Sequence, residues 1–166
     1  MKFSDPKLDR QMEKFCNGSI VERAHAASNL YHCGERSDDV LDAFNKAMQF
    51  ALSEIDLENA YWRYLVLSGV RFYGGLINRK YGQVSDGLEC ESFRDIIVQL
   101  LSFHDCEVIA CALTAAEFDA PFQSVPLLER IETISASGRD EVLKIDFVFK
   151  RCINHLRQVR DEAKKV

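Results

Sequence analysis

The sequence predicts an all-α fold, on three observations. Apolar residues recur at three- and four-residue steps through most of the chain, and no segment shows the sustained alternation of a strand. Three prolines in 166 residues leave long stretches without a helix breaker. Apolar residues make up 47% and charged residues 28%, which is the composition of a folded protein. At this length we expect one domain over residues 1–166.

The first two helices are marked by their ends. After a short helix over 6–15, Ser19 and Glu22 have the spacing of a capping box, in which each satisfies a backbone N–H of the other. The second helix then runs to about Cys33, with Gly34 placed as its C-terminal stop.

The third and fourth helices are expected over 37–52 and from about 56 to 82. The third has a clear amphipathic stripe of apolar residues. Either Asp56 or Asn59 can cap the fourth. Gly74 and Gly75 inside it indicate a kink or a close contact with another helix.

The second half of the chain begins with a segment of loop composition, residues 82–90. Breaks at His104–Asp105, at Asp119–Pro121 and at Ser137–Gly138 then separate the remaining helices. These four helices are expected over 92–103, 105–117, 122–136 and 139–163.

The stretch Phe93–Glu129 has the most regular organisation. An apolar helix ends at a turn with Asp105, a second helix carries Ala112 and Ala116, and Val125–Pro126 opens the next. Weaker echoes of the second helix start at Arg23 and Arg63, which with Ile109 gives spacings of 40 and 46 residues.

This pattern resembles the HEAT repeat in its short bacterial form. The resemblance implies an α-α superhelix of about four helix pairs, over 1–34, 37–82, 91–118 and 121–164. It also implies a concave surface formed by the second helices. Ile109 departs from the family's pattern, which has Arg there, and the copy at Arg63 lacks the paired alanines.

Charge and cysteine usage bear on partners and compartment. The net charge is −5, which disfavours a nucleic-acid partner, although residues 138–166 carry 8 basic and 5 acidic side chains. Six cysteines have no CxxC spacing and most lie among apolar neighbours, which is typical of free, buried thiols. There is no signal-peptide stretch or membrane span, so we expect a cytoplasmic protein without a membrane partner.

Catalytic, cofactor and metal sites are not expected. The four histidines lack metal-ligand spacing; His32 and Cys33, for example, are adjacent and point about 100° apart on a helix. His104 lies in a turn beside Asp105, where helix capping is the usual role. There is no HExxH, glycine-rich phosphate loop or nucleophile elbow.

Residues that could contact a protein partner fall into an acidic and an aromatic group. Asp38 and Asp39 suit the first turn of a helix, but with Asp42 they could also face a partner. Most of the aromatic residues between Tyr61 and Tyr73 are expected in the core, with Tyr61 contributing to packing and Tyr64 exposed. The candidate partner-binding residues are Asp38, Asp39, Asp42, Asn59, Arg63, Tyr64 and Glu107.

The leading functional hypothesis is a non-catalytic protein-binding module of unknown oligomeric state. Its acidic body suits an immunity-type protein that neutralises a basic toxin domain by direct binding. The alternatives are an adaptor or scaffold, a phycobilisome-type chromophore lyase, and a helical-repeat DNA glycosylase. The last needs a basic groove, whereas residues 1–137 have a net charge of −8.

Overall fold

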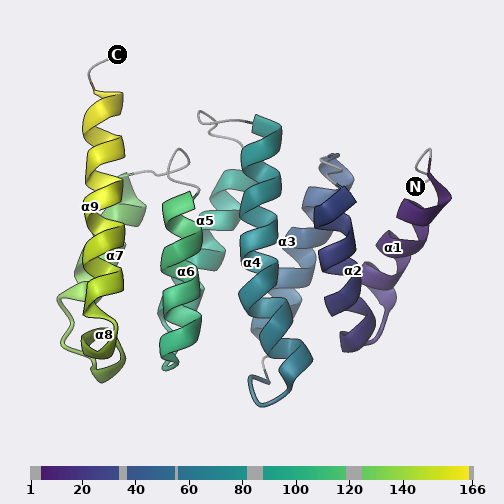
Figure 1. The fold of residues 1–166 in the computed structure, drawn as a ribbon, viewed down its shortest axis with the longest axis horizontal. Coiled ribbons are helices and arrows are strands. Elements are labelled where there is room, and N and C mark those ends of the chain that lie inside the picture. The colour runs from purple at the N-terminus through teal and green to yellow at the C-terminus, as the bar shows by residue number, and fades with distance from the viewer. Residues whose placement is uncertain (1–4, 34–36, 55, 82–87, 119–124, 165–166) are drawn as a thin grey trace. The chain divides into compact units, whose positions relative to one another are not determined.

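The structure is a computed structural model that describes residues 5–33, 37–54, 56–81, 88–118 and 125–164 (Figure 1). These residues form helices and turns without a strand, so the all-α prediction is confirmed. Contacts divide the chain into two compact units, Met1–Lys80 (unit 1) and Tyr81–Val166 (unit 2), and each is described by itself. The single domain stays a prediction. The helices are α1 (Pro6–Asn17), α2 (Ile20–Cys33), α3 (Asp38–Ser53), α4 (Ala60–Tyr81), α5 (Leu88–Leu101), α6 (Cys106–Phe118), α7 (Val125–Ser135), α8 (Asp140–Lys144) and α9 (Asp146–Ala163).

The turn between α1 and α2 follows from two local features. A Cβ on Gly18 would lie 2.4 Å from the carbonyl oxygen of Lys14, so the chain can turn this tightly only without a side chain. The predicted capping box is confirmed, because the Ser19 N–H donates to Glu22 Oε2 (3.0 Å) and the Glu22 N–H donates to Ser19 Oγ (3.4 Å).

Unit 1 consists of two helix pairs packed side by side. Helix α1 packs against α2 and α3, and the Phe15 and Phe44 rings meet between α1 and α3 at 4.7 Å. Phe44 also stacks on Tyr73 of α4 at 6.3 Å. Between α2 and α4, Tyr31 stacks on Phe72 at 4.6 Å. The first helices of the two pairs therefore adjoin each other, and so do the second helices.

Glycines in α4 allow its neighbours to approach closely. A Cβ on Gly69 would lie 2.8 Å from the Met48 sulfur of α3, and one on Gly75 would lie 3.0 Å from the Tyr31 ring of α2. Of the two alternatives predicted for Gly74 and Gly75, the structure shows the close helix contact at Gly75. Helix α4 runs from Ala60 to Tyr81 as one element.

Unit 2 repeats the pair-on-pair packing. Helix α5 packs on α6 and α7, while α9 packs on α6 and α7. Asp105 caps α6 as predicted, since its Oδ1 accepts from the N–H groups of Glu107 (2.9 Å) and Val108 (3.0 Å). Gly138 has a φ of 70°, a left-handed conformation that suits glycine after the end of α7.

Two predicted boundaries in the second half were wrong. Residues 88–90 belong to α5 and not to a loop, because leucine and glutamate have a high helix propensity. The rest of the predicted loop, residues 82–87, lies outside the described part. The predicted last helix is interrupted at Ile145, whose N–H donates to Val142 O (3.2 Å) in a turn over residues 142–145. Helix α8 packs on α6 near the α5–α6 turn, whereas α9 packs along both α6 and α7.

Candidate functional site

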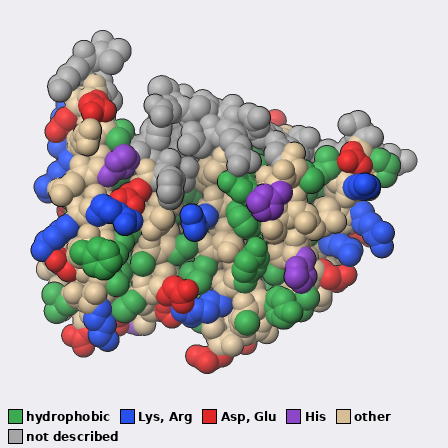
Figure 2. Space-filling model, in the orientation of Figure 1, with side chains coloured by type: hydrophobic (Ala, Val, Ile, Leu, Met, Phe, Trp, Pro, Cys, Tyr) green, Lys and Arg blue, Asp and Glu red, His purple; other side chains and the backbone are tan. Residues whose placement is uncertain are grey.

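Unit 1 exposes a group of large apolar side chains at the N-terminal ends of α2 and α4. Tyr61 and Tyr64 of α4 are 42% and 40% exposed, and Phe50, near the end of α3, is 40% exposed. Figure 2 shows hydrophobic and histidine side chains gathered over α2 and α4. These side chains and the residues whose rings or guanidinium contact them are called the aromatic surface below. It consists of Val21, Arg23, His25, Phe50, Tyr61, Trp62 and Tyr64.

Ring contacts connect the aromatic surface across three helices. Phe50 of α3 contacts Trp62 of α4, with ring centroids 5.4 Å apart. His25 of α2 meets Tyr61 of α4 edge to face at 6.1 Å. The rings are thus held by neighbours on other helices, which lowers the conformational entropy that a partner would have to remove.

Arg23 is the fixed cation of this surface. Its guanidinium carbon lies 5.0 Å from the centroid of the Phe50 ring, an arrangement worth about 0.5–1 kcal/mol at an exposed site. Its Nε donates to Gly18 O (2.9 Å) and its Nη1 donates to Phe15 O (3.2 Å). These bonds orient the guanidinium and tie the start of α2 to the end of α1.

The predicted candidates on α4 have different roles. Tyr64 is exposed as expected, but Tyr61, which was expected to contribute to packing, is also exposed. The expectation was wrong because the Tyr61 ring lies against the His25 ring, which is itself exposed and does not cover it. Asn59 caps α4, since its Oδ1 accepts from Tyr61 N–H (3.0 Å) and Trp62 N–H (3.4 Å). Arg63 is half-buried.

The predicted acidic candidates lie elsewhere. Asp38, Asp39 and Asp42 are exposed in the first turns of α3, and Asp42 pairs with Lys46 at 2.6 Å. A helix of 16 residues is about 24 Å long, so these carboxylates lie at the opposite end of α3 from Phe50. Glu107 is exposed in the first turn of α6, in unit 2. Within unit 1, the acidic candidates and Tyr64 therefore do not form a single site.

Phe50 and His25 were not predicted from the sequence to belong to a site. Both lie on helices whose apolar stripe was assigned to the core, and helical spacing does not reveal which edge of a stripe a neighbouring helix leaves uncovered. One feature of the sequence did set α4 apart from the rest of the chain. Helix α4 contains four Lys or Arg residues and no Asp or Glu, although the chain as a whole is acidic.

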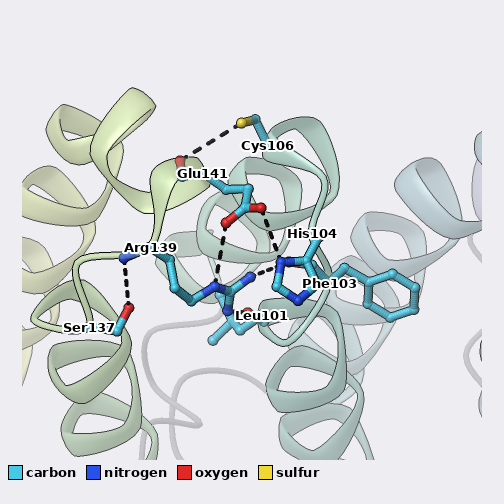
Figure 3. Close-up of polar contacts among 7 residues, drawn as sticks. All are labelled: Leu101, Phe103, His104, Cys106, Ser137, Arg139 and Glu141. Atoms are coloured by element: carbon cyan, nitrogen blue, oxygen red, sulfur yellow. Dashed lines mark hydrogen bonds and ion pairs between the residues drawn. The ribbon is translucent and has the colours of Figure 1, made fainter.

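A polar cluster in unit 2 links the α5–α6 turn to the start of α8 (Figure 3). Arg139 donates to the carbonyl oxygens of Leu101 (3.2 Å) and Phe103, at the end of α5. Its Nε lies 3.5 Å from Glu141 Oε2, and the other carboxylate oxygen lies 3.0 Å from His104 Nδ1. Hydrogen bonds from a backbone N–H and from His104 lower the pKa of Glu141.

This cluster is explained by helix packing. The Cys106 thiol lies 3.8 Å from the backbone oxygen of Glu141, and Figure 3 shows the thiol and the His104 ring on different sides of the Glu141 carboxylate. A cysteine nucleophile needs its base within hydrogen-bond reach, which is not the arrangement drawn. Arg139 instead supplies donors to carbonyl groups that the end of α5 leaves without helical partners.

The cysteines are less buried than their apolar neighbours suggested. Cys16 and Cys33 are exposed and Cys106 and Cys111 are half-buried, so the expectation that most are buried was wrong. They lie at helix ends or on partly covered faces, where apolar neighbours in sequence point elsewhere. Burial raises the pKa of the Cys152 thiol to about 12, and its S–H lies 3.5 Å from Leu113 O. That thiol stays protonated at neutral pH.

A shallow depression of about 270 Å³ lies between α1 and α2 and is lined by Gly18 and Glu22 among others. Its charges are mixed, with Arg10 and Lys14 beside Glu13 and Glu22. The capping box holds the carboxylate of Glu22, and hydrogen bonds from the Ser19 N–H and hydroxyl lower the pKa of this carboxyl. These features do not select one class of ligand.

Neither the described residues nor comparison with known proteins indicates a further site. Within the described part of the chain, no cluster of three or more His, Cys, Asp or Glu side chains could hold a metal ion. None of the helices, as far as they are described, is long and apolar enough to cross a membrane. No family model matches the sequence, and neither a curated protein nor a solved structure matches it significantly.

Proposed function

We propose that this protein is a non-catalytic protein-binding module built of HEAT-like helix pairs. The observation that carries the proposal is the aromatic surface of unit 1, where Tyr61, Tyr64 and Phe50 are each about two-fifths exposed. Tyrosine, tryptophan and arginine are the residues most often found as energetic anchors of protein interfaces.

The pairwise packing of each unit supports the HEAT-like part of the proposal. In both units the first helix of one pair adjoins the first helix of the next, and the second helices adjoin likewise. The small residues Ala26 and Ala27 in α2, with Ala112 and Ala116 in α6, are fully buried, as close packing of second helices requires. We propose that four such pairs form one superhelix.

A tagged full-length protein tests the binding proposal. It would be purified from its native cells as wild type, as the double variant Tyr61→Ala/Tyr64→Ala, and as the control Leu143→Ala/Phe147→Ala. The control removes an exposed apolar pair from unit 2, where Leu143 and Phe147 are 62% and 68% exposed. We expect one protein to co-purify in stoichiometric amount with wild type and control and to be lost with the α4 variant.

Two results would contradict this proposal. If no protein co-purifies with wild type at any growth stage, the chain is not a stable binding module. If the partner is lost only with the control variant, then binding uses α8 and α9, and the aromatic surface is not the docking site.

A narrower proposal is neutralisation of a basic toxin domain. The exposed carboxylates of Asp38, Asp39 and Asp42 at the start of α3 support it, since they would attract a cationic partner. Co-expression with a toxin encoded beside this gene tests it. The triple variant D38N/D39N/D42N should lose protection, and full protection by that variant would exclude these carboxylates as the contact.

A further inference from the structure

Helix α4 is basic, whereas the chain as a whole is acidic. Helix α4 contains no Asp or Glu in its 22 residues, and it contains four Lys or Arg. Helix α2 contains one carboxylate, Glu22, which accepts hydrogen bonds from the backbone and hydroxyl of Ser19. The chain nevertheless has a net charge of −5, so α4 differs in sign from the chain that contains it.

Among the residues of α4 whose side chains the structure describes, Arg71 is an exposed cation. It follows Tyr64 by seven residues, so it lies on the same side of α4 and about 10 Å further along the helix. His25 and His32 are exposed on the adjoining helix α2, and their rings contact the α4 rings Tyr61 and Phe72.

The other end of the aromatic surface has the opposite charge. Glu54, Asp56 and Glu58 are exposed in the connection between α3 and α4, next to the start of α4. An acidic group at that end would be repelled, whereas one placed near Arg71 would be attracted. The charges therefore define a direction along α4, from the acidic connection through Tyr61 and Tyr64 to Arg71.

We infer that the aromatic surface binds an acidic segment of a partner protein that carries an apolar anchor side chain. The anchor contacts Tyr61 and Tyr64, and a carboxylate about 10 Å away faces Arg71. This inference rests on the proposed protein-binding function and adds the chemistry and the orientation of the partner. A basic segment would meet Arg71 and the carboxylate-free face of α4 with like charge.

Selection of peptides tests this inference. A displayed library of random 12-residue peptides would be selected on the full-length protein, and each recovered peptide would be measured against Tyr64→Ala. We expect the Tyr64-dependent peptides to contain more Asp and Glu than the unselected library. They should also contain an aromatic or branched apolar residue beside the acidic group. This residue should lie on the same side of the acidic group, N-terminal or C-terminal, in all of the selected peptides.

Matched charge reversals provide the second readout. Arg71→Glu should weaken binding of the selected peptides roughly threefold to tenfold, the range expected when an exposed ion pair becomes a repulsive one. Arg130→Glu is the control, because Arg130 is also an exposed arginine on a helix but belongs to α7 of unit 2. Far-UV circular dichroism and melting temperature would establish that the variants are folded.

The outcomes separate this inference from the proposed function. If Tyr64-dependent peptides are recovered without an excess of acidic residues, or if Arg71→Glu binds them as Arg130→Glu does, the aromatic surface binds protein but not an acidic segment. If no recovered peptide depends on Tyr64, both the surface and its partner chemistry are refuted.

Discussion

Three of the tyrosines on α4 allow the exposed surface to be distinguished from the core by one kind of substitution. Tyr73 is fully buried and its ring stacks on Phe44, whereas Tyr61 and Tyr64 are 42% and 40% exposed. Each Tyr→Ala change gives the same gain in helix propensity, about 0.5 kcal/mol. Differences among the three variants therefore report the surroundings of each ring.

The expected magnitudes differ severalfold. Removing a fully buried aromatic ring costs about 3–5 kcal/mol, because the packing contacts are lost and a cavity remains. At Tyr64 water replaces the ring, no cavity forms, and the propensity gain offsets part of the lost contact. We expect Tyr64→Ala, and likewise Tyr61→Ala, to cost about 1 kcal/mol or less.

Urea denaturation followed by far-UV circular dichroism measures this difference. With a slope of about 2 kcal/mol/M, Tyr73→Ala should lower the midpoint by about 2 M and Tyr64→Ala by less than about 0.5 M. If Tyr64→Ala lowers the midpoint as much as Tyr73→Ala does, the Tyr64 ring is covered in solution. The aromatic surface would then be part of the core.

Three further predictions concern the contacts that hold the helices. Arg139→Ala should destabilise the protein by about 2–3 kcal/mol in the same urea assay, because charged donors are removed from two carbonyl groups, whereas Arg130→Ala should cost less than about 0.5 kcal/mol. The pKa of Glu22 is lowered by folding, so its stabilising effect is present above the ordinary value of 4.5 and is lost as the pH falls below it. The protection of the first-turn amides of α2, measured as hydrogen exchange relative to the intrinsic rate at each pH, should fall on acidification in wild type and less so in Glu22→Gln. The pKa of Cys152 is about 12, so iodoacetamide at pH 8 should modify the exposed Cys16 in the native protein and leave Cys152 unmodified, as mass spectrometry would show.

Each of these predictions has a contradicting result. Equal costs for the two arginine variants would show that the carbonyl contacts of Arg139 do not stabilise unit 2. Identical acid dependence of exchange in wild type and Glu22→Gln would mean that the capping box does not determine the acid response of α2. Modification of Cys152 at the rate of Cys16 in folded protein would show that the thiol is reached from solvent.

Local signals in the sequence predicted the helix ends well. The Ser19–Glu22 spacing, Asp105 and Gly138 each act through their own neighbours in the chain, so they can be interpreted without knowing the fold. The break at Ile145 could not be predicted in this way. Val142 and Phe149, on either side of it, are both buried and continue the helical period, while α8 packs on α6 and α9 packs on α6 and α7.

The aromatic surface required the structure for the same reason. Tyr61 and Tyr73 both fit the apolar pattern of α4. Phe44 of α3 covers Tyr73, however, whereas Tyr61 contacts an exposed histidine. Which edge of a helix stays uncovered depends on where its neighbours end. The sequence did place Tyr64 on the exposed side, because the residues around it sufficed to fill the core.

Photo-crosslinking from α4 tests the central claim most directly. Tyr64 would be replaced by a photo-reactive benzoylphenylalanine in the full-length protein in its native cells, and Gln49, an exposed residue of α3, would be replaced in the same way as a control. If α2 and α4 dock a partner, irradiation should attach one protein to position 64, at a yield that falls when unlabelled protein competes, and should not attach it to position 49. Equal labelling at both positions, or no specific adduct at position 64, would contradict the account.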